Sequence, residues 1–306
     1  MRKTIIFTVL FAGIFSLSAC KKTDTTDTTP SLSGLVINEA VPYVAIGEEL
    51  VFKANTSGLI VSKGTMPSPI GIYWQVNSSV KDTLSTNVKI DNPEFKYRAD
   101  TLGSYSVACY AFGAEVYNAS AITSFKAIDP SAAIGGILAN DTATINGKVW
   151  TARNYNGGDK SGFSYKNASV VDNLFGRFYT WEDAQEICPD GWHLPTAEEW
   201  DSLGEDAGEL MGDARFLGDD MWVPALGQEI TNSYGFNAIP VGYMDGAASM
   251  YKFRRYGEMA AFWTASDATS DASLAQFRYI LYDSPKLMKG NGDKNSLALS
   301  VRCVKD

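Results

Sequence analysis

The sequence predicts a two-domain fold, in which an all-β sandwich is followed by a domain of helices and strands. Three observations predict this fold. About 270 residues follow a short leader and a polar segment, which is enough for two domains of ordinary size. Turn-forming residues gather at 129–136, between two strand-rich stretches. Two helix-capping signatures occur in the second stretch.

The first 19 residues have the layout of a secretory signal peptide. Arg2 and Lys3 precede an apolar run at 4–19, which is shorter than the ~20 residues of a membrane-spanning helix. The run ends in Leu-Ser-Ala-Cys, which resembles the lipobox of bacterial lipoproteins. The resemblance implies cleavage before Cys20 and an acyl anchor on that cysteine. The alternative is an ordinary secreted protein in which a cysteine happens to follow the cleavage site.

The residues after the leader favour an acidic chain tethered to a membrane. Without Arg2 and Lys3, 24 basic side chains (26 − 2) remain against 35 acidic ones, a net charge of −11. This charge argues against nucleic acid as a partner. Residues 20–33 have little apolar surface to bury, which predicts a flexible tether. Lys21 and Lys22 differ from the Asp that commonly retains lipoproteins at the inner membrane, so we expect attachment to the outer membrane, with surface or periplasmic exposure left open.

Residues 34–128 are predicted to form an antiparallel β-sandwich. Strand signals recur along this stretch, most clearly at 104–110, where Tyr105, Val107 and Cys109 share one face. Several short strands at this spacing favour a sandwich. A series of positions resembles Ig-like and PKD-like modules, although a valine stands where antibody domains have their second disulfide cysteine: Trp74, Asp100, Gly103, Tyr105 and Val107. The resemblance implies an Ig-like architecture and nothing more specific. A spacer is the default role for such a module, since fold alone does not give function.

Residues 137–306 are predicted to form the second domain, with two short helices near its middle. The helices should begin after Thr180 and Thr196, because an acidic residue follows each threonine three positions later, as in a capping signature. The first helix should end at Cys188, since Pro189 follows it.

The second domain also carries a series of short motifs in a definite order. They are Gly147-Lys148-Val149-Trp150, Cys188-Pro189-Asp190-Gly191-Trp192-His193-Leu194-Pro195, Glu199-Trp200, Gly235-Phe236-Asn237, Phe262-Trp263 and Val301-Arg302-Cys303. Together they resemble the landmarks of the FISUMP family, the Fib-succ-major paralogous domain. The resemblance implies a C-type-lectin-like α+β fold, with two short helices against a twisted antiparallel sheet and long irregular loops. It implies an exported protein and no particular chemistry.

The cysteines predict one disulfide. If Cys20 is lipidated, three cysteines remain, and one pair is expected in an exported protein. Cys303 shares a strand face with apolar residues, and Cys188 ends the first predicted helix. We therefore expect a Cys188–Cys303 bridge, which would stabilise the domain by roughly 4 kcal/mol in the chain-entropy model. Cys109 would then be a small buried hydrophobic residue in the other domain.

The sequence predicts no catalytic residues, no metal and no cofactor. His193 is the single histidine, and its apolar neighbours favour a structural role. Glu198 and Asp201 could form an acidic pair, although Glu198 is explained more simply as a first-turn acid of a helix. A cluster of acids could coordinate Ca²⁺, but solvated side chains are the better explanation: Glu205, Asp206, Glu209, Asp213, Asp219 and Asp220.

Aromatic and basic residues on loops of the second domain form a candidate ligand surface. Such residues are enriched where proteins contact partners, and aromatic faces also stack on carbohydrate. The candidates are Tyr243, Tyr251, Arg254, Arg255, Tyr256, Arg278 and Tyr282. In the strand at 277–282, we expect Phe277, Tyr279 and Leu281 on one side and Arg278 and Tyr282 on the ligand side. The alternative is an ordinary long loop with some buried rings.

Three functions are compatible with these features. The first is a lipid-anchored surface protein that binds a glycan or protein ligand through its second domain, without enzymatic activity. The second is a structural component of a surface assembly. The third, less favoured, is an enzyme acting on carbohydrate.

Overall fold

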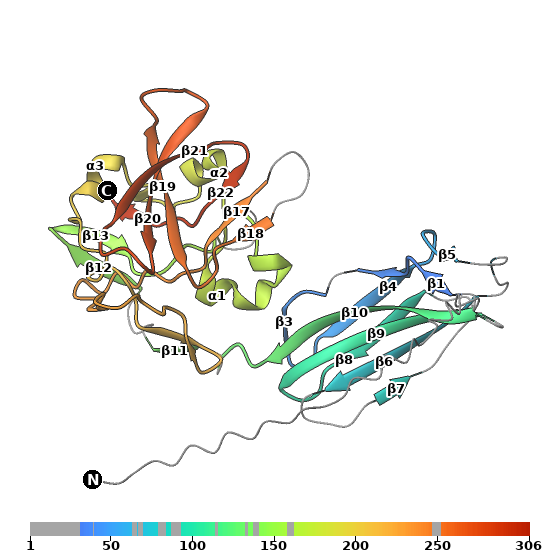
Figure 1. Cartoon of the computed structure of the whole chain (residues 1–306). Coiled ribbons are helices and arrows are strands. Elements are labelled where there is room, and N and C mark those ends of the chain that lie inside the picture. Colours follow the sequence, from blue (N-terminus) through green and yellow to red (C-terminus); the bar gives the residue numbers. More distant parts are fainter. Residues whose placement is uncertain are drawn as a thin grey trace, which may run out of the picture.

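The computed structural model describes residues 31–38, 40–62, 66, 70–78, 84–86, 93–113, 116–131, 134–136, 141–157, 162–246 and 252–306. The predicted signal peptide, the lipidation site Cys20 and most of the predicted tether lie outside the described residues, as does Tyr251. The described chain forms two β-rich parts and is 9% helical (Figure 1).

The first part contains two sheets that face each other across one hydrophobic core (Figure 1). The larger sheet has the strand order β3-β10-β9-β6-β7, and the smaller one has the order β2-β4-β8. β3 runs parallel to β10, and the other neighbours are antiparallel. The strands are β2 (Val36–Ile37), β3 (Tyr43–Ala45), β4 (Glu49–Asn55), β6 (Gly71–Ser78), β7 (Leu84–Thr86), β8 (Glu94–Arg98), β9 (Gly103–Gly113) and β10 (Val116–Ile128).

Alternation along these strands directs large side chains into the space between the sheets. In β9, Tyr105, Val107 and Cys109 are all buried, on the face that the sequence predicts. Trp74 of β6 stacks on Phe95 of β8 with 5.5 Å between ring centroids, so the two sheets share one aromatic core. Cys109 is a free thiol, and burial raises its pKa to about 12.

The sandwich begins before the predicted boundary at Gly34. β1 (Leu32–Ser33) pairs with β5 (Ile60–Val61), and the Leu32 side chain joins the core. Residues 31–33 therefore belong to the sandwich rather than to the tether.

The second part combines small antiparallel sheets with short helices (Figure 1). Its sheets have the strand orders β11-β15-β16, β12-β13-β23-β14, β18-β17-β22 and β19-β20-β21. The strands are β11 (Ile134–Gly136), β12 (Thr142–Ile145), β13 (Lys148–Thr151), β14 (Trp192–His193), β15 (Ala214–Phe216), β16 (Asp219–Asp220), β17 (Tyr243–Asp245), β18 (Lys252–Arg254), β19 (Met259–Asp267), β20 (Leu274–Leu281), β21 (Met288–Asp293), β22 (Leu297–Ala298) and β23 (Val304–Lys305). The helices are η1 (Tyr165–Asn167), η2 (Ser169–Val171), α1 (Asp172–Phe175), α2 (Trp181–Glu186) and α3 (Ala197–Asp201).

The two predicted capping signatures both mark the start of a helix. Thr180 accepts a hydrogen bond from the backbone N–H of Asp183 at the start of α2. Thr196 and Glu199 form a complete capping box at the start of α3. Each cap satisfies backbone donors that the first turn would otherwise leave unpaired.

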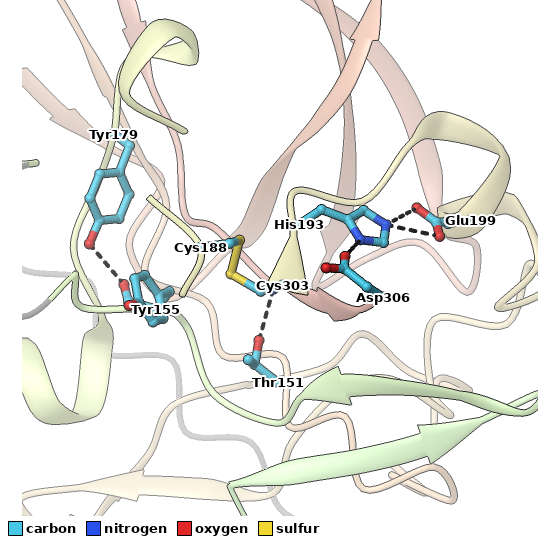
Figure 2. Close-up of a disulfide and its surroundings, with 8 residues drawn as sticks. All are labelled: Thr151, Tyr155, Tyr179, Cys188, His193, Glu199, Cys303 and Asp306. Carbon is cyan, nitrogen blue, oxygen red and sulfur yellow. Dashed lines mark hydrogen bonds and ion pairs between the residues drawn. A yellow bond between two sulfur atoms is a disulfide. The ribbon is translucent and has the colours of Figure 1, made fainter. Parts of the chain in front are cut away.

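The structure joins Cys188 to Cys303, the pair that the sequence predicts (Figure 2). The bridge connects the end of α2 to the C-terminal segment, 115 residues later in the chain. The neighbouring β23 pairs with β13, so the last strand of the second part lies in one sheet with an early strand of that part.

Apolar side chains also pack between the two parts. Tyr43 of β3 contacts Phe216 of β15 edge to face, with 4.9 Å between ring centroids. Ile128, at the end of β10, is buried in the same cluster. The second part begins before the predicted boundary at 137, because β11 pairs with β15. Among the described residues, no helix is long and apolar enough to cross a membrane.

Candidate functional site: an aromatic cleft

The sheet β19-β20-β21 has one covered face and one partly open face. In β20, the side chains of Phe277, Tyr279 and Leu281 point to one face, and those of Arg278 and Ile280 point to the other, because neighbours in a strand alternate. Arg278 and Ile280 are buried, whereas the other three side chains are half-buried. The difference leaves apolar and aromatic surface accessible on one side of the strand.

The partly open face lines a cleft of about 380 Å³. This volume lies within the range of roughly 300–1,000 Å³ that small-molecule pockets have. The cleft is formed by β17, β19, β20, β21, β22 and the residues next to them. Its lining residues are Tyr243, Asp245, Arg255, Met259, Phe277, Tyr279, Leu281, Gly290, Asn291, Leu297 and Leu299.

Two glycines shape the cleft walls. A Cβ atom at Gly290 of β21 would lie 2.5 Å from the ring of Phe277, so the missing side chain lets this ring lie against the neighbouring strand. Gly242, directly before β17, has a φ angle of +73°, and a Cβ atom there would overlap the carbonyl oxygen of Arg254. Only glycine meets both conditions at position 242, and it lets β17 begin at Tyr243 in the cleft wall.

The two charged residues that line the cleft, Asp245 and Arg255, each have a partner just outside the lining. The Oδ2 atom of Asp245 lies 4.0 Å from Nε of Arg254, and the Nε–H of Arg255 donates to Glu258 with 3.2 Å between the heavy atoms. All four side chains are about half exposed to solvent, so these pairs contribute little to stability. Their charges cancel, two acids against two bases, which leaves the rim polar without a dominant sign.

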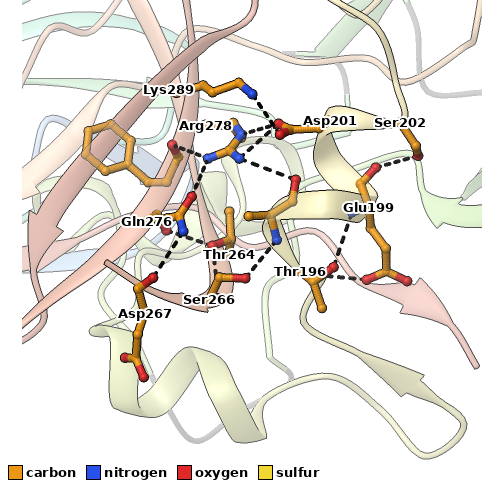
Figure 3. Close-up of polar contacts among 12 residues, drawn as sticks. Thr196, Glu199, Asp201, Ser202, Thr264, Ser266, Asp267, Gln276, Arg278 and Lys289 are labelled. Carbon is orange, nitrogen blue, oxygen red and sulfur yellow. Dashed lines mark hydrogen bonds and ion pairs between the residues drawn. The ribbon is translucent and has the colours of Figure 1, made fainter. Parts of the chain in front are cut away.

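The covered face of β20 is closed by an ion pair with α3 (Figure 3). Arg278, which is 1% exposed, donates from Nε to Asp201 at 2.9 Å, and Lys289 contacts the same carboxylate at 2.7 Å. Burial raises the pKa of the Asp201 carboxyl, but hydrogen bonds from Lys289 and Arg278 outweigh burial and hold that pKa below its ordinary value. Arg278 also donates a hydrogen bond to the carbonyl oxygen of Ala197 in α3.

The assignment of Arg278 to a ligand surface is therefore corrected. The alternation in this strand is as predicted, but the face that was expected to meet a ligand is the buried one. Arg278 points toward α3 because Asp201 supplies a carboxylate there. The side chains that face the cleft are those of Phe277, Tyr279 and Leu281.

The model of the Fibrobacter succinogenes major domain (Fib_succ_major) matches residues 143–305, more than half of the chain. The chain belongs to the Fib_succ_major family. The resemblance seen in the sequence motifs is thus confirmed for the family. The chain is also similar to the adhesin InvE of Yersinia pseudotuberculosis, at 11% identity and a TM-score of 0.27 over 90% of this chain and 70% of that chain. A TM-score this low establishes no common fold. No curated protein matches the chain.

Two of the motifs that carry the Fib_succ_major resemblance contact each other in the core. Arg302 of the Val-Arg-Cys motif is fully buried and donates to the carbonyl oxygens of Phe236 and Asn237 in the Gly-Phe-Asn motif, at 2.7 and 3.0 Å. Its guanidinium also lies over the Phe236 ring, 4.4 Å from the centroid. Burial lowers the pKa of Arg302 to about 9. These motifs build the domain interior rather than the cleft.

His193 lies in a chain of charged groups away from the cleft (Figure 2). Its Nδ1 atom lies 2.7 Å from Asp306, and its Nε2 atom lies 3.0 and 3.1 Å from the two oxygens of Glu199. Lys148 contacts the same Glu199 carboxylate at 2.6 Å. The network connects β13, β14, α3 and the C-terminal residue. His193 is therefore partly exposed and faces carboxylates as well as its apolar neighbours in the sequence, and its structural role stays a prediction.

The remaining members of the predicted ligand surface are divided among different sites. Tyr243 and Arg255 line the aromatic cleft. Arg254 lines a different cleft, between the two parts of the molecule, together with residues of both parts. Tyr251 lies outside the described residues. The predicted surface is therefore not one continuous site.

Two predicted tyrosines pack against other side chains but are only partly buried, with Tyr256 37% exposed. The Tyr256 ring lies 5.3 Å from that of Tyr165 and 5.7 Å from that of Phe175, and burial of its hydroxyl raises its pKa. Tyr282 packs against the core on the covered side of the sheet. Neither tyrosine lines the aromatic cleft.

Glu198 and Asp201, the possible acidic pair in the sequence, lie in different environments. Glu198 is exposed on α3, whereas Asp201 is held by Arg278 and Lys289. In the part of the chain that the structure describes, no group of three or more His, Cys, Asp or Glu side chains is placed to hold a metal ion.

Proposed function

We propose that the chain is an exported lipoprotein, anchored through Cys20, that binds a ligand in the aromatic cleft of its Fib_succ_major domain. The cleft is the observation that carries the proposal. It presents half-buried rings next to polar groups in a volume that suits a ligand. The proposed ligand is a glycan or a protein segment outside the cell membrane.

The anchor is supported by the leader and its Leu-Ser-Ala-Cys end. The proposed site of attachment is the outer membrane, with the folded parts outside it. Stable anchoring of this kind requires more than one acyl chain, because a single chain binds a bilayer only reversibly.

The first part is proposed to be an Ig-like spacer. β6, β9 and β10 lie in one sheet, as the corresponding strands of Ig-like sandwiches do, and Trp74 of β6 lies in the core. The hydroxyl of Tyr105 donates to the carbonyl oxygen of Thr101 at 2.7 Å, which resembles the tyrosine corner of such domains.

The second part is proposed to have a C-type-lectin-like fold. The short helices α2 and α3, the small antiparallel sheets and the long segments between them support this assignment. The proposal makes the protein a binding protein rather than an enzyme, in keeping with the engagement of Asp201 in ion pairs.

The proposal is tested on intact cells that produce the chain. Protease added outside should remove the folded parts from the wild type, and a Cys20→Ser variant should be lost from the membrane fraction. Cells with the wild-type chain should adhere to a ligand-bearing surface more strongly than cells with a Tyr279→Ala variant. Full protection from protease would contradict surface exposure. Recovery of the chain only in a stable surface complex, with no cleft-dependent adhesion, would favour a structural component instead.

A further inference from the structure

The size of the cleft limits the kind of ligand it takes. Stable protein–protein interfaces bury about 800 Å² on each partner over a broad surface. A cleft of about 380 Å³ instead encloses one compact group. A ring-sized ligand fits this volume better than a folded protein surface does.

The floor of the cleft is aromatic, and its edges are polar. The rings of Phe277 and Tyr279 lie side by side on β20, with 5.5 Å between their centroids. Tyr243, Asp245 and Asn291 add a hydroxyl, a carboxylate and an amide to the lining. A pyranose ring has the complementary surface, because one face exposes C–H groups that stack on an aromatic ring. Its hydroxyls both donate and accept hydrogen bonds, as the lining groups require.

The charges at the rim favour a ligand without charge. Arg254 is near Asp245 and Arg255 is bonded to Glu258, so each guanidinium already faces a carboxylate. An acidic sugar would meet the carboxylate of Asp245 in the lining and would have to compete with Glu258 for Arg255. A neutral hydroxyl can instead donate to Asp245 without displacing a charge.

We propose, on the basis of the function proposed above, that the cleft binds one neutral pyranose unit of a glycan. The apolar face of the sugar stacks on Tyr279 and Phe277, and its hydroxyls bond to Asp245. The absence of a side chain at Gly290 keeps Phe277 in the position that this stacking uses.

The full chain, purified in detergent, is tested on a printed array of neutral, uronic-acid-bearing and sulfated oligosaccharides, and the best binder is titrated calorimetrically. Tyr279→Ala and Asp245→Asn should each weaken binding about tenfold or more, whereas Tyr279→Phe should retain most of it. Gly290→Ala places a methyl group against Phe277 and should also weaken binding. This variant provides a second test of the cleft if Tyr279→Ala fails to fold. The matched control is Tyr110→Ala, which removes a half-buried tyrosine from the sandwich and should leave affinity unchanged.

Selective binding of neutral oligosaccharides that is lost in the cleft variants would support the proposal. Preference for acidic oligosaccharides, or equal affinity in Tyr279→Ala and Tyr110→Ala, would overturn it. Absence of binding across the array, combined with cleft-dependent adhesion to periodate-treated cells, would overturn the sugar ligand while the proposed binding function stands. Absence of both array binding and cleft-dependent adhesion would overturn both.

Discussion

The two faces of β20 differ in how the rest of the chain completes them. On one face, Arg278 is buried and forms an ion pair with the carboxylate of Asp201 in α3. On the other face, Phe277 and Tyr279 are half-buried and pack in one hydrophobic cluster with Trp263 and Cys303. A single strand therefore supplies a closed structural face and an accessible one.

The covered face and the hydrophobic cluster of the other face contain different stabilising links, an ion pair and a disulfide. On the covered face, the buried guanidinium of Arg278 pairs with the carboxylate of Asp201. A buried charge is stable only while its partner is present. The hydrophobic cluster that includes the cleft rings also contains both cysteines of the Cys188–Cys303 disulfide, a covalent link that does not depend on exclusion of solvent. Removing the ion pair and the disulfide in separate variants should show how much each contributes to the free energy of unfolding.

The largest effect is expected from removal of the disulfide. A Cys188→Ala/Cys303→Ala variant frees a loop of 115 residues, so the free energy of unfolding should fall by about 4 kcal/mol. Urea unfolding followed by tryptophan fluorescence reports this change, because six of the seven tryptophans lie after residue 134. Cys109→Ala is the control, since that thiol is free and lies in the sandwich. An equal loss in the control would contradict the assignment of the effect to the disulfide.

The local features of this domain could be predicted from the sequence because the residues that determine them are close together in the chain. Thr180 and Thr196 cap helices through side chains that bond only three residues ahead. The alternation in β20 likewise follows from strand geometry alone. The choice of covered face could not be predicted in this way, because it depends on Asp201, which lies 77 residues before Arg278 in the chain.

The cleft has a weak signal in the sequence of β21. Gly290 and Gly292 alternate within a strand, and glycines at such positions indicate that another group approaches closely. Which ring fills the space depends on the register between β20 and β21, where Phe277 lies opposite Gly290. The register between β20 and β21 cannot be derived from composition or from the spacing of residues, because an irregular turn connects the two strands.

The second effect tests the covered face. Asp201→Ala leaves the guanidinium of Arg278 buried without a carboxylate, so the free energy of unfolding should fall by about 3 kcal/mol. Lys289→Ala is the matched control, because it removes the exposed partner of the same carboxylate and should cost less than about 1 kcal/mol. Arg278→Met, which removes the buried charge itself, should fall between the two. Equal losses for Asp201→Ala and Lys289→Ala in urea titrations would show that burial of Arg278 does not decide the effect.

The smallest effect concerns His193, which connects α3 of the covered face to the C-terminal segment next to Cys303. Carboxylates only accept hydrogen bonds, so both ring nitrogens can donate to Asp306 and Glu199 only when the imidazole is protonated. Burial by itself lowers the pKa of His193, but the hydrogen bonds to Asp306 and Glu199 outweigh it and raise that pKa above its ordinary value.

The sign of the resulting pH dependence follows from the raised pKa. The stabilisation should be complete below about pH 6.5, the ordinary pKa of histidine, and should be lost as the pH rises through the pKa of the folded protein. The melting temperature of the wild type should therefore decline over this range relative to that of His193→Gln, and Asp306→Asn should reduce the decline. Because His193 is the single histidine, its ring proton gives one titrating NMR signal, and a midpoint at or below about 6.5 would contradict the ion-paired geometry.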